Sequence, residues 1–291
     1  MTAMAFPPAA TESERHPALE SVTIQRWRNG RFQACTDLAA AEIPVSLEYN
    51  GISHAVMLAS PTDIEDFATG FSLTEGIIGH PREILDLETE ACREGLQVRL
   101  TIAAARFDRL KRHRRSLAGR TGCGLCGAES LSQVFRDVAP VTSPVAMAAE
   151  VLNAAFAGLE EVQPLQRLTG ATHAAAWVEP DGRLAMIRED VGRHNALDKL
   201  IGAMALAGID TAAGAAMVTS RASYEMVQKA AAAGIGILAA ISAPTVLAIR
   251  MAEALNLTLV GFARRDQHVL YAGPQRIRAQ AVSPCTDSDE R

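Results

Sequence analysis

The chain has 291 residues, enough for two domains with buried cores. With 48% hydrophobic and 21% charged residues, the composition excludes global disorder and a collagen-like protein. A net charge of −5 and only 4% aromatic residues argue against a protein that binds nucleic acid over its whole surface. The five cysteines are an odd number, and no charged-then-apolar leader opens the chain. We therefore expect neither a disulfide framework nor secretion.

One uncharged run, residues 230–249, is long enough for a membrane-spanning helix. Gly234, Gly236 and Pro244 interrupt it, which favours a short buried strand over 235–241 followed by a helix. We predict no contact with a membrane.

The first half of the chain has a β pattern. We interpret residues 1–20 as a flexible tail and 21–120 as a β-rich N-terminal domain. Two strands, 44–49 and 52–59, are separated only by Asn50-Gly51, which is a strong hairpin signal. Ser60 and Pro61 then predict the start of a helix that runs to about Glu75. The remaining predicted strands of this half cover 22–27, 85–89 and 96–103.

In the second half, strands alternate with helices, which predicts a largely parallel sheet covered by helices. We place this domain at 131–275 and a C-terminal tail at 276–291. A first helix is predicted from Ser143-Pro144 to about Phe156. The predicted strands are 172–178, 184–187, 215–219, 235–241 and 257–262, and the helices between them are 195–207, 224–233 and 245–255.

A basic stretch, residues 106–120, holds seven Lys or Arg residues and a single Asp. Such a run is commonly a solvated helix face or a linker. Alternatively, it meets phosphates or an acidic partner and lowers the pKa of the thiols that follow it. The sequence leaves both interpretations open.

The sharpest motif is Cys123-Gly124-Leu125-Cys126-Gly127, preceded by Gly122. Glycines on every side let another molecule approach either sulfur closely, so we expect residues 121–130 to form a mobile, exposed loop. Four interpretations compete: a structural zinc site, a thioredoxin-type redox pair, an inert buried pair and a sulfur relay. In the relay, the Cys123 thiolate takes up sulfur as a persulfide and Cys126 assists its release.

Polar residues also follow three neighbouring predicted strands. The carboxyl ends of parallel strands are where open α/β sheets bind ligands, so we expect these segments to converge on a phosphate-bearing ligand. For His194, capping of a helix explains the residue as well as ligand contact does. The candidate residues are Asp190, His194, Ser220, Arg221, Phe262, Ala263, Arg264, Arg265, Asp266 and Gln267. The sequence has no phosphate-binding lysine loop, no dinucleotide fingerprint and no serine elbow.

These features resemble those of a known family, the formate dehydrogenase accessory sulfurtransferases (FdhD/NarQ). The resemblance covers most of the chain outside its tails, and it includes the thiol motif. Its segments are Pro44–Gly51, Pro61–Ile78, Cys123–Gly127, Glu189–Lys199, Ser220–Ala230 and Leu257–Phe262.

The resemblance implies a cytoplasmic sulfurtransferase required for formate dehydrogenase activity. Such a protein accepts sulfur from a cysteine desulfurase and sulfurates the molybdenum bis(guanine dinucleotide) cofactor before its insertion into formate dehydrogenase. It also implies a homodimer, with Cys123 as the persulfide-bearing residue, Cys126 as its partner, and Phe262–Gln267 as the cofactor-contacting segment. A GDP-like guanine nucleotide is the expected analogue of the bound cofactor. An alternative is a non-catalytic chaperone that only binds the cofactor.

The family core is similar to the cytidine deaminase-like three-layer α/β/α fold. Zinc deaminases need a His-x-Glu or Cys-x-Glu pair and a Pro-Cys-x-x-Cys motif. Here His173 is not followed by the glutamate, and Ser220–Ser223 stands where the cysteines would be. We therefore expect no intrinsic zinc and a pocket available for a guanine nucleotide.

Overall fold

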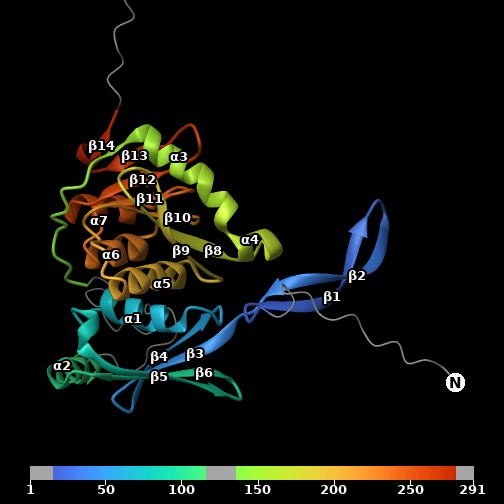
Figure 1. The fold of residues 1–291 in the computed structure, drawn as a ribbon, viewed down its shortest axis with the longest axis horizontal. Helices are drawn as coiled ribbons and strands as arrows, with labels where there is room; N and C mark the ends of the chain where they lie inside the picture. Colours follow the sequence, from blue (N-terminus) through green and yellow to red (C-terminus); the bar gives the residue numbers. More distant parts are fainter. Residues whose placement is uncertain (1–15, 116–135, 280–291) are drawn as a thin grey trace, which may run out of the picture.

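The computed structural model describes residues 16–115 and 136–279 and contains two bodies and a projecting arm (Figure 1). From one side to the other, the layers are α3, a six-stranded sheet, the helices α5, α6 and α7, then α1, and a four-stranded sheet. The mixed α/β fold predicted from the sequence is confirmed.

The N-terminal body is a sheet with the strand order β4-β3-β6-β5, covered on one face by α1. The predicted hairpin at Asn50-Gly51 is confirmed, because both residues have positive φ angles, 46° and 79°, as a tight two-residue turn requires. Its strands are β3 (Ile43–Tyr49), β4 (Ile52–Ala59), β5 (Ile84–Cys92) and β6 (Gly95–Ile102).

Two strands form a separate hairpin, which we call the arm. It consists of β1 (Leu19–Arg28) and β2 (Arg31–Ala40), joined at Asn29-Gly30. The arm extends away from both bodies (Figure 1). Only its base is packed, where Ala18 and Leu19 form a small buried cluster with Leu165. The predicted β-rich N-terminal domain thus contains a second sheet that the sequence pattern did not separate from the first.

The helix predicted to begin at Ser60 begins later. Helix α1 runs over Ile64–Thr74, and Asp63 is its N-cap residue. The Ser60 hydroxyl instead accepts a hydrogen bond from the Val191 amide at 3.1 Å, so this residue joins the two bodies rather than capping a helix. The basic stretch begins inside α2 (Ala104–Arg115), where Arg106 forms an ion pair with Glu83.

The C-terminal body has the strand order β13-β12-β11-β10-β8-β9. The strands β10, β11 and β12 are parallel, whereas β8 is antiparallel to β10. The predicted alternation of strands and helices is confirmed, but the sheet is mixed rather than largely parallel, because the pairs β8–β9, β8–β10 and β12–β13 are antiparallel. Within this sheet, the pattern missed the edge strand β13. The strands are β8 (His173–Val178), β9 (Leu184–Asp190), β10 (Ala215–Val218), β11 (Ile237–Ala240), β12 (Thr258–Gly261) and β13 (Val269–Ala272).

Helices cover both faces of this sheet, as the three-layer prediction requires. One helix prediction started too early: residues 143–146 are not helical, and the Ser143 hydroxyl donates to the Ala212 carbonyl. The fold also extends into the predicted C-terminal tail, because Arg276 is buried and β14 (Ile277–Arg278) pairs with β7 (Met147–Ala148). The helices are α3 (Ala149–Leu159), α4 (Pro164–Thr169), α5 (Arg193–Leu206), α6 (Tyr224–Ala232) and α7 (Val246–Ala254).

The two bodies meet where α1 crosses α5. A Cβ added to Gly70 of α1 would lie 1.8 Å from the Asp198 carbonyl oxygen, so only glycine permits this approach. Buried polar groups hold the joint together. Asp190 accepts from the Ser60 amide at 2.9 Å and forms an ion pair with Lys199 at 2.7 Å. Because all three residues are fully buried, the joint is a fixed part of the interior.

Candidate functional site

The loops that follow β10, β11 and β12 converge, as the sequence predicted. Ala222 pairs with Pro244 as an isolated bridge, and the Thr245 amide donates to the Ala222 carbonyl at 3.2 Å. The next loop joins in turn, because the Phe262 amide donates to the Ser242 carbonyl at 3.4 Å. Parallel strands bring their carboxyl ends to one edge, and here that edge is closed by main-chain hydrogen bonds.

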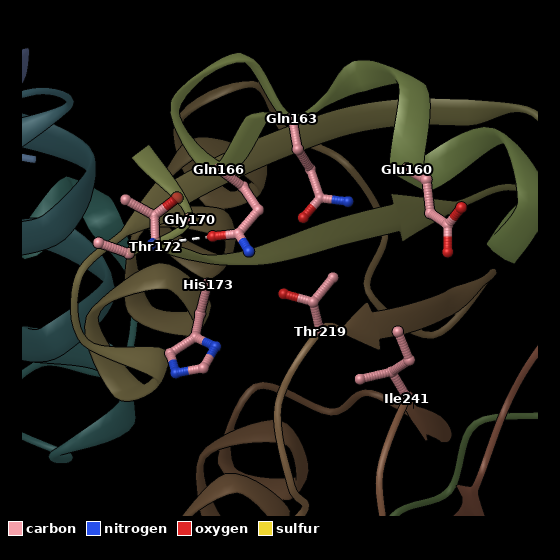
Figure 2. Close-up of a pocket in the computed structure, with 9 residues that line it drawn as sticks. Glu160, Gln163, Gln166, Gly170, Thr172, His173, Thr219 and Ile241 are labelled. Carbon is pink, nitrogen blue, oxygen red and sulfur yellow. Dashed lines mark hydrogen bonds between the residues drawn. The ribbon is translucent and has the colours of Figure 1, made fainter. Parts of the chain in front are cut away.

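A pocket of about 380 Å³ opens at this edge. It lies between the start of β8, the ends of β10 and β11, and the segment around α4 (Figure 2). Its lining is partly apolar and nearly neutral, and its polar groups are amides, hydroxyls, one imidazole and a single carboxylate. The lining residues are Glu160, Gln163, Gln166, Gly170, Ala171, Thr172, His173, Thr219 and Ile241.

Gln163 is the most informative residue of the lining. Its side-chain nitrogen donates to the Leu159 carbonyl at 2.7 Å, but its side-chain oxygen, Oε1, is buried and accepts no hydrogen bond within the described residues. A buried acceptor without a donor costs free energy, about 1–3 kcal/mol. Gln163 is 4% exposed and lines the pocket, so a ligand with an N–H donor would satisfy it.

Hydrogen bonds fix the wall beside Gln163. The carboxylate of Glu189, at the end of β9, accepts from the amides of Leu165 and Gln166 in the first turn of α4, at 3.0 and 2.8 Å. It also accepts from the Thr172 hydroxyl at 3.1 Å. The Gln166 side chain in turn accepts from the Thr172 amide at 3.0 Å (Figure 2). Glu189 lies in the Glu189–Lys199 segment that carries the family resemblance, but its sequence context alone does not predict this positioning role.

His173 and Thr219 form the floor of the pocket (Figure 2). The Thr219 hydroxyl oxygen accepts from the Ala174 amide at 2.8 Å, which fixes the side chain at the end of β10. Burial lowers the pKa of His173 below its ordinary value, so the imidazole is neutral at pH 7. From the sequence, His173 was a candidate only for the zinc site of a deaminase, and its place in the pocket was not predicted.

The predicted segment Phe262–Gln267 lies at the rim. Phe262 is exposed with a φ of 49°, and Ala263 is buried. The Arg264 guanidinium donates to the carbonyl of Ile241, a pocket residue, and therefore stands beside the opening. Arg265, Asp266 and Gln267 are exposed.

The other predicted residues fall in three places. Ser220 is buried and Arg221 is exposed, both directly after the pocket residue Thr219. His194 lies 2.8 Å from Glu225. Burial alone would raise the pKa of Glu225, but the hydrogen bond from His194 and the charges of His194, Arg193 and Lys229 together outweigh it and lower this pKa. Asp190 faces the joint between the bodies, where its carboxylate also accepts from the Gly192 amide and the Asn195 side chain, at 2.7 and 2.9 Å.

The two cysteines of the motif, Cys123 and Cys126, lie outside the described residues, as does the predicted loop 121–130. The described chain ends at the C-terminus of α2 and resumes at Arg136, which forms an ion pair with Glu75 at 3.6 Å. Within residues 16–115 and 136–279, no three His, Cys, Asp or Glu side chains are grouped closely enough to hold a metal ion. Over the same residues, no helix has the length and apolar character needed to cross a membrane.

Comparison with known proteins gives one consistent result. The model of the FdhD/NarQ family matches residues 40–278. The sulfur carrier protein FdhD of Cupriavidus necator is 56% identical over 274 residues, which are 94% of this chain and 95% of that protein. The FdhD of Bordetella bronchiseptica is 52% identical, over 92% of this chain and 98% of that protein. A crystal structure described as a formate dehydrogenase accessory protein from Desulfotalea psychrophila has the same fold, with a TM-score of 0.70 and 24% identity over 90% of this chain and 100% of that one.

Proposed function

The chain belongs to the FdhD/NarQ family, and from that premise we propose that it is a sulfur carrier that relays persulfide sulfur to the cofactor of a formate dehydrogenase. Among the described residues, the observation that supports an acceptor site is the pocket at the edge of the six-stranded sheet, with the unpaired acceptor of Gln163 inside it. The proposal makes the protein a sulfurtransferase.

The relay uses two thiols. The Cys123 thiolate attacks the terminal sulfur of a persulfide on a cysteine desulfurase, so a new S–S bond forms on Cys123 while the donor's S–S bond breaks and its thiolate leaves. The terminal sulfur then passes to the acceptor. Attack by Cys126 on the inner sulfur would release the outer one as sulfide and leave a Cys123–Cys126 disulfide, which a cellular thiol must reduce before the next cycle.

The acceptor in this proposal is the molybdenum bis(guanine dinucleotide) cofactor, bound as a substrate. A guanine base offers an N–H group and an amine, the donors that the unpaired Oε1 of Gln163 lacks. The nearly neutral lining suits a base rather than a phosphate. Arg264 at the rim supplies the positive charge that phosphates prefer.

The proposed setting follows from the same premise. The sulfur donor is a cysteine desulfurase, the recipient of the finished cofactor is formate dehydrogenase, and the location is the cytoplasm, where thiols remain reduced. The working form is a homodimer. We propose no intrinsic zinc and no contact with nucleic acid or membrane.

The first prediction concerns the sulfur-bearing thiol. After anaerobic incubation with a cysteine desulfurase and cysteine, the wild-type protein is expected to gain one sulfur on the Cys123 peptide, removable by reductant. Cys123→Ala is expected to gain none. The measurement is intact-protein and peptide mass spectrometry.

Cys92→Ala is the matched control, because Cys92 is a free, exposed cysteine on β5 whose removal should leave the gain intact. An unmodified wild-type protein in the presence of an active desulfurase would reject the relay and favour the non-catalytic chaperone. Restoration of formate dehydrogenase activity by Cys123→Ala in cells lacking the native protein would lead to the same conclusion.

The second prediction concerns Gln163. Gln163→Met removes the acceptor, so it is expected to weaken binding of GDP about 5- to 150-fold, the equivalent of the 1–3 kcal/mol that an unsatisfied buried donor costs. The thermal unfolding midpoint should change little, because the lost bond to Leu159 is offset by the loss of an unpaired buried oxygen. Isothermal titration with GDP measures the effect.

Gln33→Met on the exposed arm is the control and should bind GDP like the wild-type protein. GDP affinity that is unchanged in Gln163→Met would place the base elsewhere. This result would not contradict the persulfide chemistry of Cys123, so the relay and the nucleotide site can be rejected independently.

A further inference from the structure

Two side-chain amides of the pocket wall are fixed in opposite orientations. The Gln163 nitrogen donates to the Leu159 carbonyl at 2.7 Å, which leaves the Gln163 oxygen, Oε1, without a partner. The Gln166 oxygen accepts from the Thr172 amide at 3.0 Å, which leaves the Gln166 nitrogen, Nε2, as the free end of that side chain. A main-chain carbonyl only accepts and a main-chain N–H only donates, so neither amide can turn over without losing its partner. The wall therefore presents one fixed acceptor and one fixed donor.

Both atoms face the same space. Figure 2 shows Gln163 Oε1 and Gln166 Nε2 on the side of the pocket that looks toward its floor at His173 and Thr219. Within residues 16–115 and 136–279, Oε1 accepts no hydrogen bond, Nε2 donates none, and the two amides are not bonded to each other. The pocket volume of about 380 Å³ lies in the range of small-molecule sites, roughly 300–1,000 Å³. A ligand that carries a donor beside an acceptor would satisfy both atoms.

The buried carboxylate of Glu189 holds Gln166 and Thr172 in place. It accepts from the Gln166 main-chain amide at 2.8 Å and from the Thr172 hydroxyl at 3.1 Å. Gln166 is thus fixed at its main chain by Glu189 and at its side chain by Thr172. Gln163 stands directly before the helix α4 that Glu189 caps, and it is itself buried. Because both amides are already ordered, a ligand that binds them loses little free energy to immobilising side chains.

We infer that Gln163 and Gln166 together select a nucleobase by its lactam edge, which is a ring N–H next to a carbonyl. The N–H donates to Gln163 Oε1, and the carbonyl accepts from Gln166 Nε2. Guanine and hypoxanthine carry this edge. Adenine and cytosine carry an amine next to an unprotonated ring nitrogen, so they would place donor against donor and acceptor against acceptor. Gln166 is therefore a specificity-determining residue that excludes adenine and cytosine.

A panel of four nucleotides tests this selection on the wild-type protein. Isothermal titration of the full chain, by direct binding or by displacement of GDP, gives dissociation constants for GDP, IDP, ADP and CDP. IDP keeps the lactam edge and lacks only the amine of guanine, so it should bind within about 10-fold of GDP. ADP and CDP should bind at least about 100-fold more weakly than GDP, because two mismatched contacts replace two hydrogen bonds.

The variant Gln166→Glu tests the residue. One carboxylate oxygen can still accept from the Thr172 amide, while the other replaces the donor nitrogen with an acceptor. The ratio of the ADP to the GDP dissociation constant should therefore fall at least about 10-fold. The added negative charge repels both diphosphates alike, and a purely structural defect would weaken both alike, so this ratio reports recognition of the base. Gln33→Glu makes the same change at an exposed position of the arm and should leave the ratio within about 2-fold.

The inference rests on the nucleotide site of the proposed function, and the outcomes separate the two. A wild-type protein that binds none of the four nucleotides would reject the site and the inference with it. ADP that binds as tightly as GDP, or IDP that binds as weakly as ADP, would overturn the inference alone. An unchanged ratio in Gln166→Glu would do the same, and because it needs only the wild-type protein, the nucleotide panel decides the question even if this variant does not fold.

Discussion

Lys229 is a buried ammonium group where the two bodies meet. Its Nζ lies 2.9 Å from an Asp198 carboxylate oxygen and 3.1 Å from Glu75, and it donates to the Thr74 hydroxyl at 3.0 Å. Burial alone would lower the pKa of Lys229, but the charges of Asp198 and Glu75 outweigh it and raise that pKa. The ammonium is therefore charged and shared between α1, α5 and α6.

The ion pair between Glu75 and Lys229 leads to a prediction on how stability depends on pH. Burial alone would raise the pKa of Glu75, but the charges of Lys229 and Arg136 outweigh it and lower this pKa below the ordinary 4.5. The unfolded chain therefore binds the proton more readily, so the contribution of Glu75 is complete above its unfolded pKa and is lost as the pH falls through the folded pKa. Urea unfolding at pH 7 and pH 4 should show a smaller loss of stability for Glu75→Gln than for the wild-type protein.

Glu253→Gln is the control, because Glu253 is an exposed carboxylate on α7. It should lose as much stability between the two pH values as the wild-type protein does. Equal losses in all three proteins would show that Glu75 is not linked to folding.

At the scale of elements, the contact between α1 and α5 depends on two facing glycines. A Cβ on Gly202 of α5 would lie 1.9 Å from the Asp66 carbonyl oxygen, and Gly70 has the reciprocal restriction against Asp198. Neither backbone can move without opening the joint, where Asp198 also meets Lys229. The crossing is a main-chain contact, more restrictive than packing between side chains.

Gly70→Ala should therefore lower the free energy of unfolding by at least about 2 kcal/mol, although alanine by itself favours a helix. Gly158→Ala in α3 is the matched control, since its Cβ would lie 3.5 Å from a Leu184 methyl group, an ordinary contact. That variant should be unchanged or up to about 1 kcal/mol more stable. Chemical denaturation compares the two, and equal stabilities would refute the close crossing.

Elements with strong local signals were predictable from the sequence. The Asn50-Gly51 turn and the alternating strands and helices of the second half are dictated by backbone preference and periodicity, and the structure confirms them. The prediction that Ser60 caps a helix was wrong, because Ser60 instead forms hydrogen bonds with Val191 and Asp190, about 130 residues away in the sequence. The short α4 carries little periodicity, and it depends on Glu189 to cap its first turn.

The whole molecule explains what the sequence could and could not say about the site. Convergence of the three strand-end loops follows from topology and was predictable. Gln163 was not, because an unpaired oxygen exists only once α3, α4 and the sheet have closed around it. Asp190 was predicted as a ligand residue because it stands at the end of a strand. In the structure its carboxylate instead binds the Ser60 amide of the N-terminal body and pairs with Lys199.

The joint around Asp190 also has a consequence for synthesis on the ribosome. The Ser60 amide and the Asp190 carboxylate are separated by 130 residues. At about 5–20 residues per second, Ser60 is synthesised roughly 6 to 26 seconds before Asp190. Until α5 is made, Gly70 of α1 lacks the backbone that it packs against and the Ser60 amide lacks its carboxylate partner, so an N-terminal fragment expressed without α5 would expose both to water.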